Sequence, residues 1–152
     1  MRLHAVIAFI AVLSAFMPPA VAAEFGTKEE AVTIVKRIQE KFKKDGAEQT
    51  FKAVSDKSTK EFQADDLDPF ISDLSGRIFA GAQRSLIGKN MIDIKDPDGK
   101  YPVRMMIDIA KGPGSGWVNY KWLNPRTNKI QQKTTYIEKM GDYFVGAGIY
   151  LK

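Results

Sequence analysis

The chain has 152 residues with a formal net charge of +5, and 27% of its residues are charged. This length is enough for one domain with a single hydrophobic core. The basic residues are dispersed and form no block interleaved with aromatic residues, which argues against nucleic-acid binding. The chain contains no cysteine, which excludes disulfides, thiol chemistry and a lipid anchor attached to cysteine.

Residues 1–23 have the pattern of a secretory signal peptide. Arg2 supplies a positive start, residues 5–16 form a mostly apolar run, and two prolines and several small residues follow. This run is short for a membrane span, which needs about 20 residues. We therefore expect cleavage after Ala22 or Ala23, which leaves residues 24–152 as a single soluble domain in an exported compartment.

The predicted signal peptide contains His4, which is the only histidine of the chain. A mature protein without histidine and cysteine lacks the commonest general base, the commonest metal ligand and the best thiol nucleophile. No pair of lysine or carboxylate groups stands out as a substitute. The sequence thus predicts a protein that is not an enzyme, with no cofactor and no metal site.

The first element expected after the signal peptide is a helix. Thr27 and Glu30 have the spacing of a capping box, and apolar residues then recur at helical spacing. Gly46 is a stop signal, and a shorter second helix is expected after it. Residues 55–66 are polar and rich in turn formers, which predicts a loop.

Beyond this loop the pattern becomes that of strands, interrupted by one helix. A turn at Ser75-Gly76 and two later hairpin turns separate the apolar segments. The expected strands cover residues 69–73, 77–81, 117–122, 130–139 and 143–150, and the expected helix covers residues 101–111. The resulting order, ααββαβββ, predicts an α+β domain in which five antiparallel strands form a sheet with the helices packed on one face.

Two loops resemble ligand sites but fit turns better. Residues 112–116 are glycine-rich but lead from a helix into a strand, whereas a phosphate-binding loop leads from a strand into a helix. Residues 96–99 are acidic, but an EF-hand register on Gly99 places Ile94 and Met105 where carboxylate ligands are needed.

The strand over residues 117–122 is the strongest candidate for a binding site. Successive side chains of a strand point to opposite faces, which places Val118, Tyr120 and Trp122 on one face. The simplest interpretation is that these three residues belong to the core. The alternative is a small concave site for a carboxylate, because aromatic walls, a phenol and cations suit that group. Neighbouring elements offer three polar residues for such a site: Arg104, Lys133 and Tyr136.

The second half of the chain carries a series of motifs. They are a GKN turn, a DGK-x-x-V-R helix, a GSGW-V-x-Y-K-W strand, a K-x-T-Y strand and a final GDYFVG-x-GIY strand. In this combination residues 85–152 resemble a single Cache domain of bacterial exported proteins. The upstream helices and the SDLSGRIFA hairpin fit the same family more loosely.

The resemblance implies a PAS-like fold outside the cytoplasm, with a long N-terminal helix and a central antiparallel sheet. It also implies sensing of a small molecule, for single Cache domains often a short organic acid such as acetate, propionate, lactate or pyruvate. By position, six residues would line or border the ligand pocket: Phe79, Arg104, Tyr120, Trp122, Lys133 and Tyr136.

The chain departs from the family pattern at three places. Leu123 and Gln132 occupy positions where proline is common, and Asp68-Pro69 replaces an apolar or aromatic pair at the first strand. Pro69 predicts that this strand either lies at the edge of the sheet or begins near this residue. Asp68 would make the mouth of the pocket less favourable to an anion.

The leading hypothesis is a periplasmic, stand-alone Cache domain that binds a short-chain carboxylate for sensing or signalling. Because the chain ends at Lys152, directly after the last expected strand, output is expected to need a membrane sensor kinase, chemoreceptor or transporter as partner. The alternative is a structural or regulatory interaction module with a vestigial pocket.

Overall fold

The structure, a computed structural model, describes residues 26–59, 61–62 and 67–151. The predicted signal peptide, residues 1–23, lies outside these ranges. The helices are α1 (Lys28–Ser55), the short 3-10 helix η1 (Arg84–Leu86) and α2 (Pro102–Lys111). The strands are β1 (Asp68–Asp73), β2 (Ile78–Gly81), β3 (Ser115–Asn124), β4 (Lys129–Met140) and β5 (Tyr143–Tyr150).

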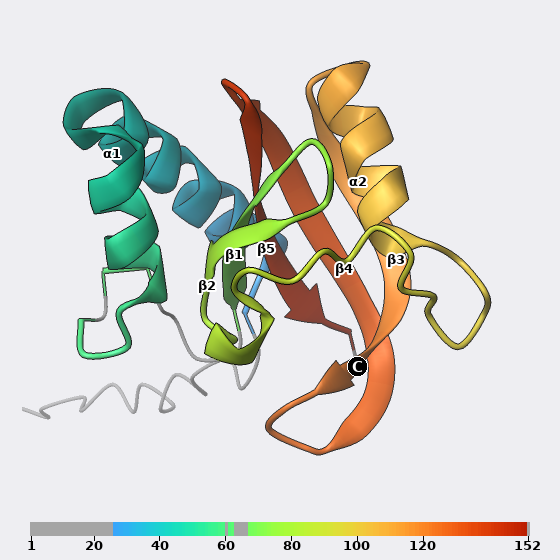
Figure 1. Ribbon diagram of the computed structural model, residues 1–152. Helices are drawn as coiled ribbons and strands as arrows, with labels where there is room; N and C mark the ends of the chain where they lie inside the picture. The colour runs from blue at the N-terminus through green and yellow to red at the C-terminus, as the bar shows by residue number, and fades with distance from the viewer. Residues whose placement is uncertain (1–25, 60, 63–66, 152) are drawn as a thin grey trace, which may run out of the picture.

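The five strands form one antiparallel sheet in the order β2-β1-β5-β4-β3, as drawn in Figure 1. This confirms the predicted α+β class, the five-stranded antiparallel sheet and every predicted strand, with small shifts at the strand ends. Because β5 follows β4 in a hairpin and then pairs with β1, the first and last strands of the chain lie side by side at the centre of the sheet. The sequence did not predict η1.

Helix α1 begins at the predicted capping box. The Glu30 amide donates to the Thr27 hydroxyl at 3.2 Å, and the Glu30 carboxylate accepts from the Thr27 amide at 2.7 Å. Gly46 has φ 80° and ψ 178°, so the helix kinks there. The predicted stop is therefore a kink, and the second helical segment continues from it to Ser55.

Replacing Gly46 with alanine is expected to lower the free energy of unfolding by about 1–3 kcal/mol, because this backbone conformation is essentially restricted to glycine. A Cβ at this position would meet nothing within 4 Å, so the effect comes from the backbone alone. Urea denaturation measures it, with the exposed Lys44→Ala as control. Unchanged stability of Gly46→Ala would mean that α1 can straighten through residue 46.

The two α-helices cover opposite faces of the sheet (Figure 1). On one face, buried residues of α1 pack on β1 and β5: Ala31, Val35, Ile38, Ile71, Val145 and Ala147. On the other face, α2 packs on β3, β4 and β5: Val103, Met106, Ile107, Val118, Ile137 and Phe144.

The prediction that the helices pack on one face is therefore wrong. The reason is visible in β5, where residues 144–150 are all buried. A strand that alternates apolar and polar residues needs cover on one side only, whereas a strand buried along its whole length needs cover on both.

Both candidate loops are turns. In residues 96–99, the Asp96 carboxylate accepts hydrogen bonds from the amides of Asp98, Lys100 and Lys121, which fastens the turn to β3. Burial acts to raise the pKa of Asp96, but these backbone donors outweigh it and lower the pKa. At the glycine-rich loop, the Gly112 amide donates to the Asp108 carbonyl at 2.9 Å and the Gly114 amide donates to the Ile109 carbonyl at 2.8 Å, and these bonds close the C-terminal end of α2.

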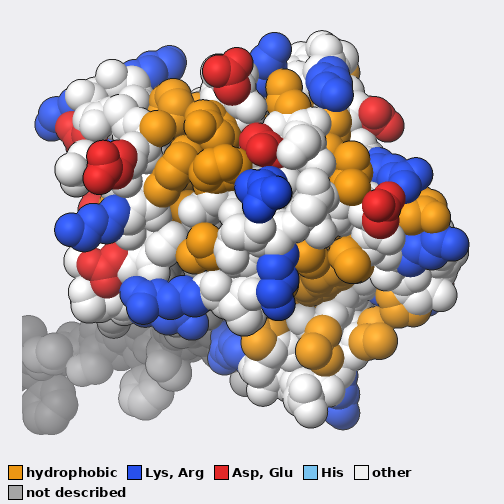
Figure 2. All heavy atoms as spheres, in the orientation of Figure 1, with side chains coloured by type: hydrophobic (Ala, Val, Ile, Leu, Met, Phe, Trp, Pro, Cys, Tyr) orange, Lys and Arg blue, Asp and Glu red, His pale blue; other side chains and the backbone are white. Residues whose placement is uncertain are grey.

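Charged side chains of both signs are interspersed over the face shown in Figure 2. This agrees with the dispersed charge expected from the sequence. In the described part of the chain, no helix combines the length and the apolar character needed to cross a membrane.

Candidate functional site

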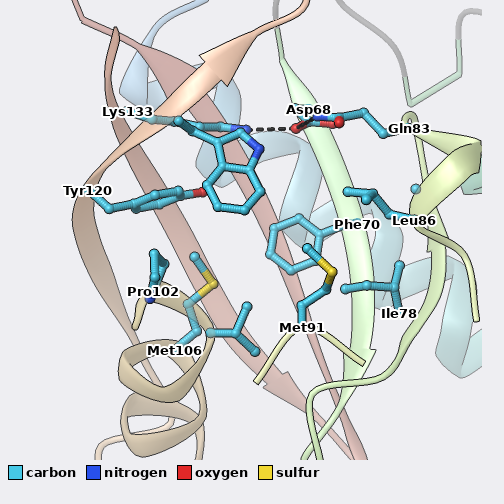
Figure 3. A pocket seen from close by; sticks show the side chains of 13 residues that line it. Asp68, Phe70, Ile78, Gln83, Leu86, Met91, Pro102, Met106, Tyr120 and Lys133 are labelled. Atoms are coloured by element: carbon cyan, nitrogen blue, oxygen red, sulfur yellow. Dashed lines mark hydrogen bonds and ion pairs between the residues drawn. The ribbon is translucent and has the colours of Figure 1, made fainter. Parts of the chain in front are cut away.

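A cavity of about 60 Å³ lies on the α2 face of the sheet (Figure 3). One water-sized group needs about 10–15 Å³ of cavity volume, so this cavity has room for roughly four to six non-hydrogen atoms. Most of its walls are apolar: Phe70, Ile78, Leu86, Met91, Met106 and Trp122. The polar residues of its lining are Asp68, Gln83, Tyr120 and Lys133.

The polar end of this pocket is built on an ion pair. Lys133 Nζ lies 2.6 Å from Asp68 Oδ2, and the side chains are 2% and 18% exposed. Gln83 Nε2 donates to the same oxygen at 2.8 Å. Burial alone would lower the pKa of Lys133, but the charge of Asp68 outweighs it and holds the pKa above its ordinary value. Lys133 is therefore a buried ammonium at neutral pH.

Gly148 makes this ion pair possible. Lys133 is on β4 and Asp68 is on β1, so β5 lies between them. Gly148 pairs directly with Asp68, and a Cβ at Gly148 would lie only 2.2 Å from Lys133 Cε. The lysine side chain thus passes over β5 at a position where only glycine leaves space. Gly146 makes room for Phe70 in the same way.

Aromatic residues surround the ammonium group of Lys133. The Tyr120 and Thr135 hydroxyls lie 2.9 Å apart, and the Trp122 ring packs edge-on against Tyr120. Lys133 Nζ lies 4.9 Å from the centre of the Tyr150 ring. Burial raises the pKa of Tyr120, so its phenol stays neutral at physiological pH.

The structure brings three of the six predicted site residues together. Tyr120 and Trp122 from β3 and Lys133 from β4 line the same pocket. The other three, Phe79, Arg104 and Tyr136, do not line it.

Tyr136 and Phe79 pack on the opposite side of the sheet. Tyr136 is three residues from Lys133 on β4, so the two side chains point to opposite faces. Its ring packs on Trp117, with centroids 5.2 Å apart. Phe79 packs on Phe51 of α1 and on Tyr143. The expected placement of Phe79 and Tyr136 at the pocket is thereby corrected.

Arg104 points to the surface and not toward the pocket. Its side chain is 48% exposed and forms an ion pair with Asp93, and its Nε donates to the Ile92 carbonyl at 3.1 Å. The guanidinium also lies 4.0 Å from the centre of the Tyr101 ring. These contacts fasten the loop before α2, and they correct the expectation that Arg104 borders the pocket.

Sequence reasoning missed several residues of the site. Gln83 follows β2 in an irregular segment, and no local pattern identifies it. Asp68 was predicted at the mouth of the pocket, as a departure from the family pattern, but its ion pair with Lys133 was not predicted. Tyr150 had a usable signal, because it pairs with Lys133 once β4 and β5 are joined as a hairpin.

Comparisons with known proteins agree with this architecture. A family model for the Cache domain matches residues 27–152. The sensor histidine kinase MctS of Rhizobium johnstonii is 33% identical over 85 residues, a match that covers 54% of this chain and 18% of the kinase. The chain therefore spans less than a fifth of that relative.

Two solved structures share the fold. One is the periplasmic sensor domain of a chemotaxis protein, with a TM-score of 0.63, 19% identity, and coverage of 82% of this chain and 90% of that one. The other is a Cache chemosensory domain whose title describes carboxylic acid recognition, with a TM-score of 0.60, 24% identity, and coverage of 82% and 88%. Since the family model covers nearly all of the described residues, the chain belongs to the Cache domain family, as its motifs predicted.

Proposed function

We propose that this chain binds a short-chain carboxylate in the pocket on the α2 face and serves as a sensing module. The observation that carries the proposal is a small apolar cavity with a buried ammonium at one end. Lys133 is the only basic residue among the described residues that line it. A buried cation beside apolar walls suits a ligand with one charged end and a short alkyl end.

Lys133 has hydrogen-bonding capacity left for such a ligand. An ammonium group has three donors. Asp68 accepts from Lys133 at 2.6 Å and the Tyr150 hydroxyl is a second hydrogen-bond partner of the ammonium, which leaves one donor for a ligand. The apolar walls, among them Phe70 and Met106, would contact the alkyl end. The size of the cavity favours acids of two to four carbons, such as acetate, propionate, lactate or pyruvate.

The proposal also covers location and output. The expected signal peptide and the similarity to a periplasmic sensor domain support a place in the periplasm. The match to a sensor histidine kinase supports a membrane partner such as a sensor kinase, chemoreceptor or transporter. Binding without catalysis is supported by membership of the Cache domain family and by the similarity to a periplasmic sensor domain.

A thermal-shift screen of acids with two to four carbons tests the proposal. At about a hundred times its dissociation constant, a ligand that binds only the folded state adds ~2.7 kcal/mol of stability. For a domain of this size each kcal/mol raises the melting temperature by roughly 3–5 °C, so a shift of about 10 °C is expected.

Two variants show whether this pocket is responsible. Trp122→Ala removes a pocket wall and is expected to reduce the shift, whereas Arg104→Ala, a surface cation, is expected to preserve it. If no acid shifts the wild-type melting temperature by even about 2 °C, the carboxylate proposal is wrong.

One observation favours the alternative function, an interaction module with a vestigial pocket. Lys133 already has a charged partner in Asp68, so the pocket is neutral without any ligand. Under this alternative no small acid shifts the melting temperature, and Trp122→Ala changes only the stability of the ligand-free protein. The same screen therefore distinguishes the two functions.

A further inference from the structure

An exposed apolar patch lies at the end of the β3–β4 hairpin. Leu123 and Ile130 are 50% and 58% exposed, which makes them the most exposed large apolar side chains of the described residues. They pair directly across β3 and β4, so their side chains lie next to each other on one face of the sheet. Adjacent apolar side chains that remain open to water are typical of a surface that binds a partner.

This patch belongs to a groove of about 370 Å³ at the edge of the sheet, the β3 groove. Residues of the turn before α2 line it too, and the Asp96 carboxylate fixes this turn to β3 by accepting from the Lys121 amide at 3.1 Å. The apolar residues of its lining are Pro97, Trp122, Leu123 and Ile130, and the polar ones are Lys95, Asp96 and Lys121. A concave surface of this kind accepts the side chains of a protein segment, whereas a flat membrane surface does not enter it.

The β3 groove carries an excess of positive charge. Asp96 is buried, and its oxygens already accept from three backbone amides of the turn and of β3. Lys95 is exposed and pairs with no carboxylate of the described residues. Lys121 pairs with Asp98, but both side chains are more than a third exposed, so this pair contributes little. Carboxylates on a partner are therefore the complementary charges.

A second copy of the chain fits the β3 groove poorly. Most dimers are symmetric, and a symmetry axis at the groove places the same patch on both sides of the interface. Lys95 and Lys121 would then face their own counterparts, and like charges opposed across an interface weaken it. The charges of the groove thus favour a different protein as its occupant.

We propose that the β3 groove is the docking site for a partner protein, which binds through a segment that combines apolar side chains with carboxylates. Leu123, Ile130 and Trp122 contact the apolar side chains, and Lys95 and Lys121 bind the carboxylates. Trp122 also lines the pocket on the α2 face, so the docked segment contacts a residue of the pocket wall. This inference rests on the proposed function for the need of a partner, but not on the ligand of the pocket.

Photo-crosslinking in the cells that produce the protein tests the inference. The full chain carries the photoreactive residue p-benzoylphenylalanine in place of Ile130, or in place of Leu123 as a second position. Illumination is expected to yield an adduct with another protein, in which the crosslinked peptide contains acidic and apolar residues. The control position is Ile87, which is 38% exposed and lies next to β2 at the opposite edge of the sheet, and which should not yield this adduct.

A charge variant tests the role of the lysines. Lys95→Glu, made in the chain with the photoreactive residue at position 130, is expected to lower the yield of the adduct at least about threefold, because it replaces an attraction with a like-charge contact. Lys57→Glu is the matched control, because Lys57 is also exposed but does not line the groove, and it should keep the yield. Neither lysine pairs with a carboxylate of the described residues, so neither change removes an ion pair of the fold.

The inference is wrong if neither position yields an adduct, if the adduct is a lipid or a second copy of this chain, or if Lys95→Glu leaves the yield unchanged. Its failure is separate from failure of the proposed function. An adduct together with no thermal shift from any small acid means that the groove docks a partner and that the pocket is not a carboxylate site. A thermal shift without an adduct means that the pocket binds carboxylates and that the role assigned to the groove is wrong.

Discussion

Replacing Lys133 with methionine is expected to lower the free energy of unfolding by about 3–5 kcal/mol, because it leaves Asp68 without its cation in a largely buried place. The volume of the side chain hardly changes, so the loss reports the charge and not a cavity. Urea denaturation followed by circular dichroism measures it. Lys121 pairs with Asp98, and both of these side chains are more than a third exposed, so Lys121→Met is the control, for which a change within about 1 kcal/mol is expected.

The double variant Lys133→Met with Asp68→Leu separates stability from function. Replacing both members of a buried ion pair with apolar residues is often neutral, so this variant should recover most of the stability lost in Lys133→Met. It should nevertheless bind no carboxylate. If Lys133→Met alone is as stable as the wild type, the ion pair contributes nothing to the fold, and Asp68 is solvated well enough without it.

Replacing Gly148 with alanine is expected to lower the free energy of unfolding by about 4 kcal/mol, because the new methyl group combines overpacking with displacement of Lys133 from Asp68. The methyl carbon would lie 2.2 Å from Lys133 Cε and 2.7 Å from the Thr135 hydroxyl, so one of these side chains must move. Denaturation of the single variant measures the total effect.

A double-mutant cycle assigns the cause. In the background of Lys133→Ala the methyl group has no Cε to meet, so Gly148→Ala should cost at least about 1 kcal/mol less there. Additive effects of the two substitutions would mean that Gly148 is needed for another reason, such as the contact with Thr135.

Several features of the fold were predictable because they depend on neighbours in the sequence. The capping box at Thr27 and Glu30 was recognised from a spacing of three residues and is present. Alternation on β3 correctly grouped Tyr120 with Trp122, and both line the pocket. The same rule separates Lys133 from Tyr136, which are three residues apart, and its application to β4 would have excluded Tyr136.

The positions of Arg104 and Phe79 relative to the pocket could not be predicted from local sequence patterns. The helix around Arg104 was predicted correctly, but its rotation on the sheet determines which residues reach the pocket, and the structure turns Val103 and Met106 inward instead. Phe79 is on the short edge strand β2, next to an irregular register with β1, where simple alternation is not a reliable guide.

The sequence by itself determined the α+β class, the strands, the family and the presence of a lysine and two aromatic residues suited to a binding site. Only the tertiary structure decided that the helices cover both faces, and that Lys133 meets Asp68, 65 residues away in the chain. That contact depends on the pairing of β1 with β5 and on the space above Gly148. Such pairing is a property of the whole sheet, because each strand's partner is selected by burial of both faces and not by residues adjacent in sequence.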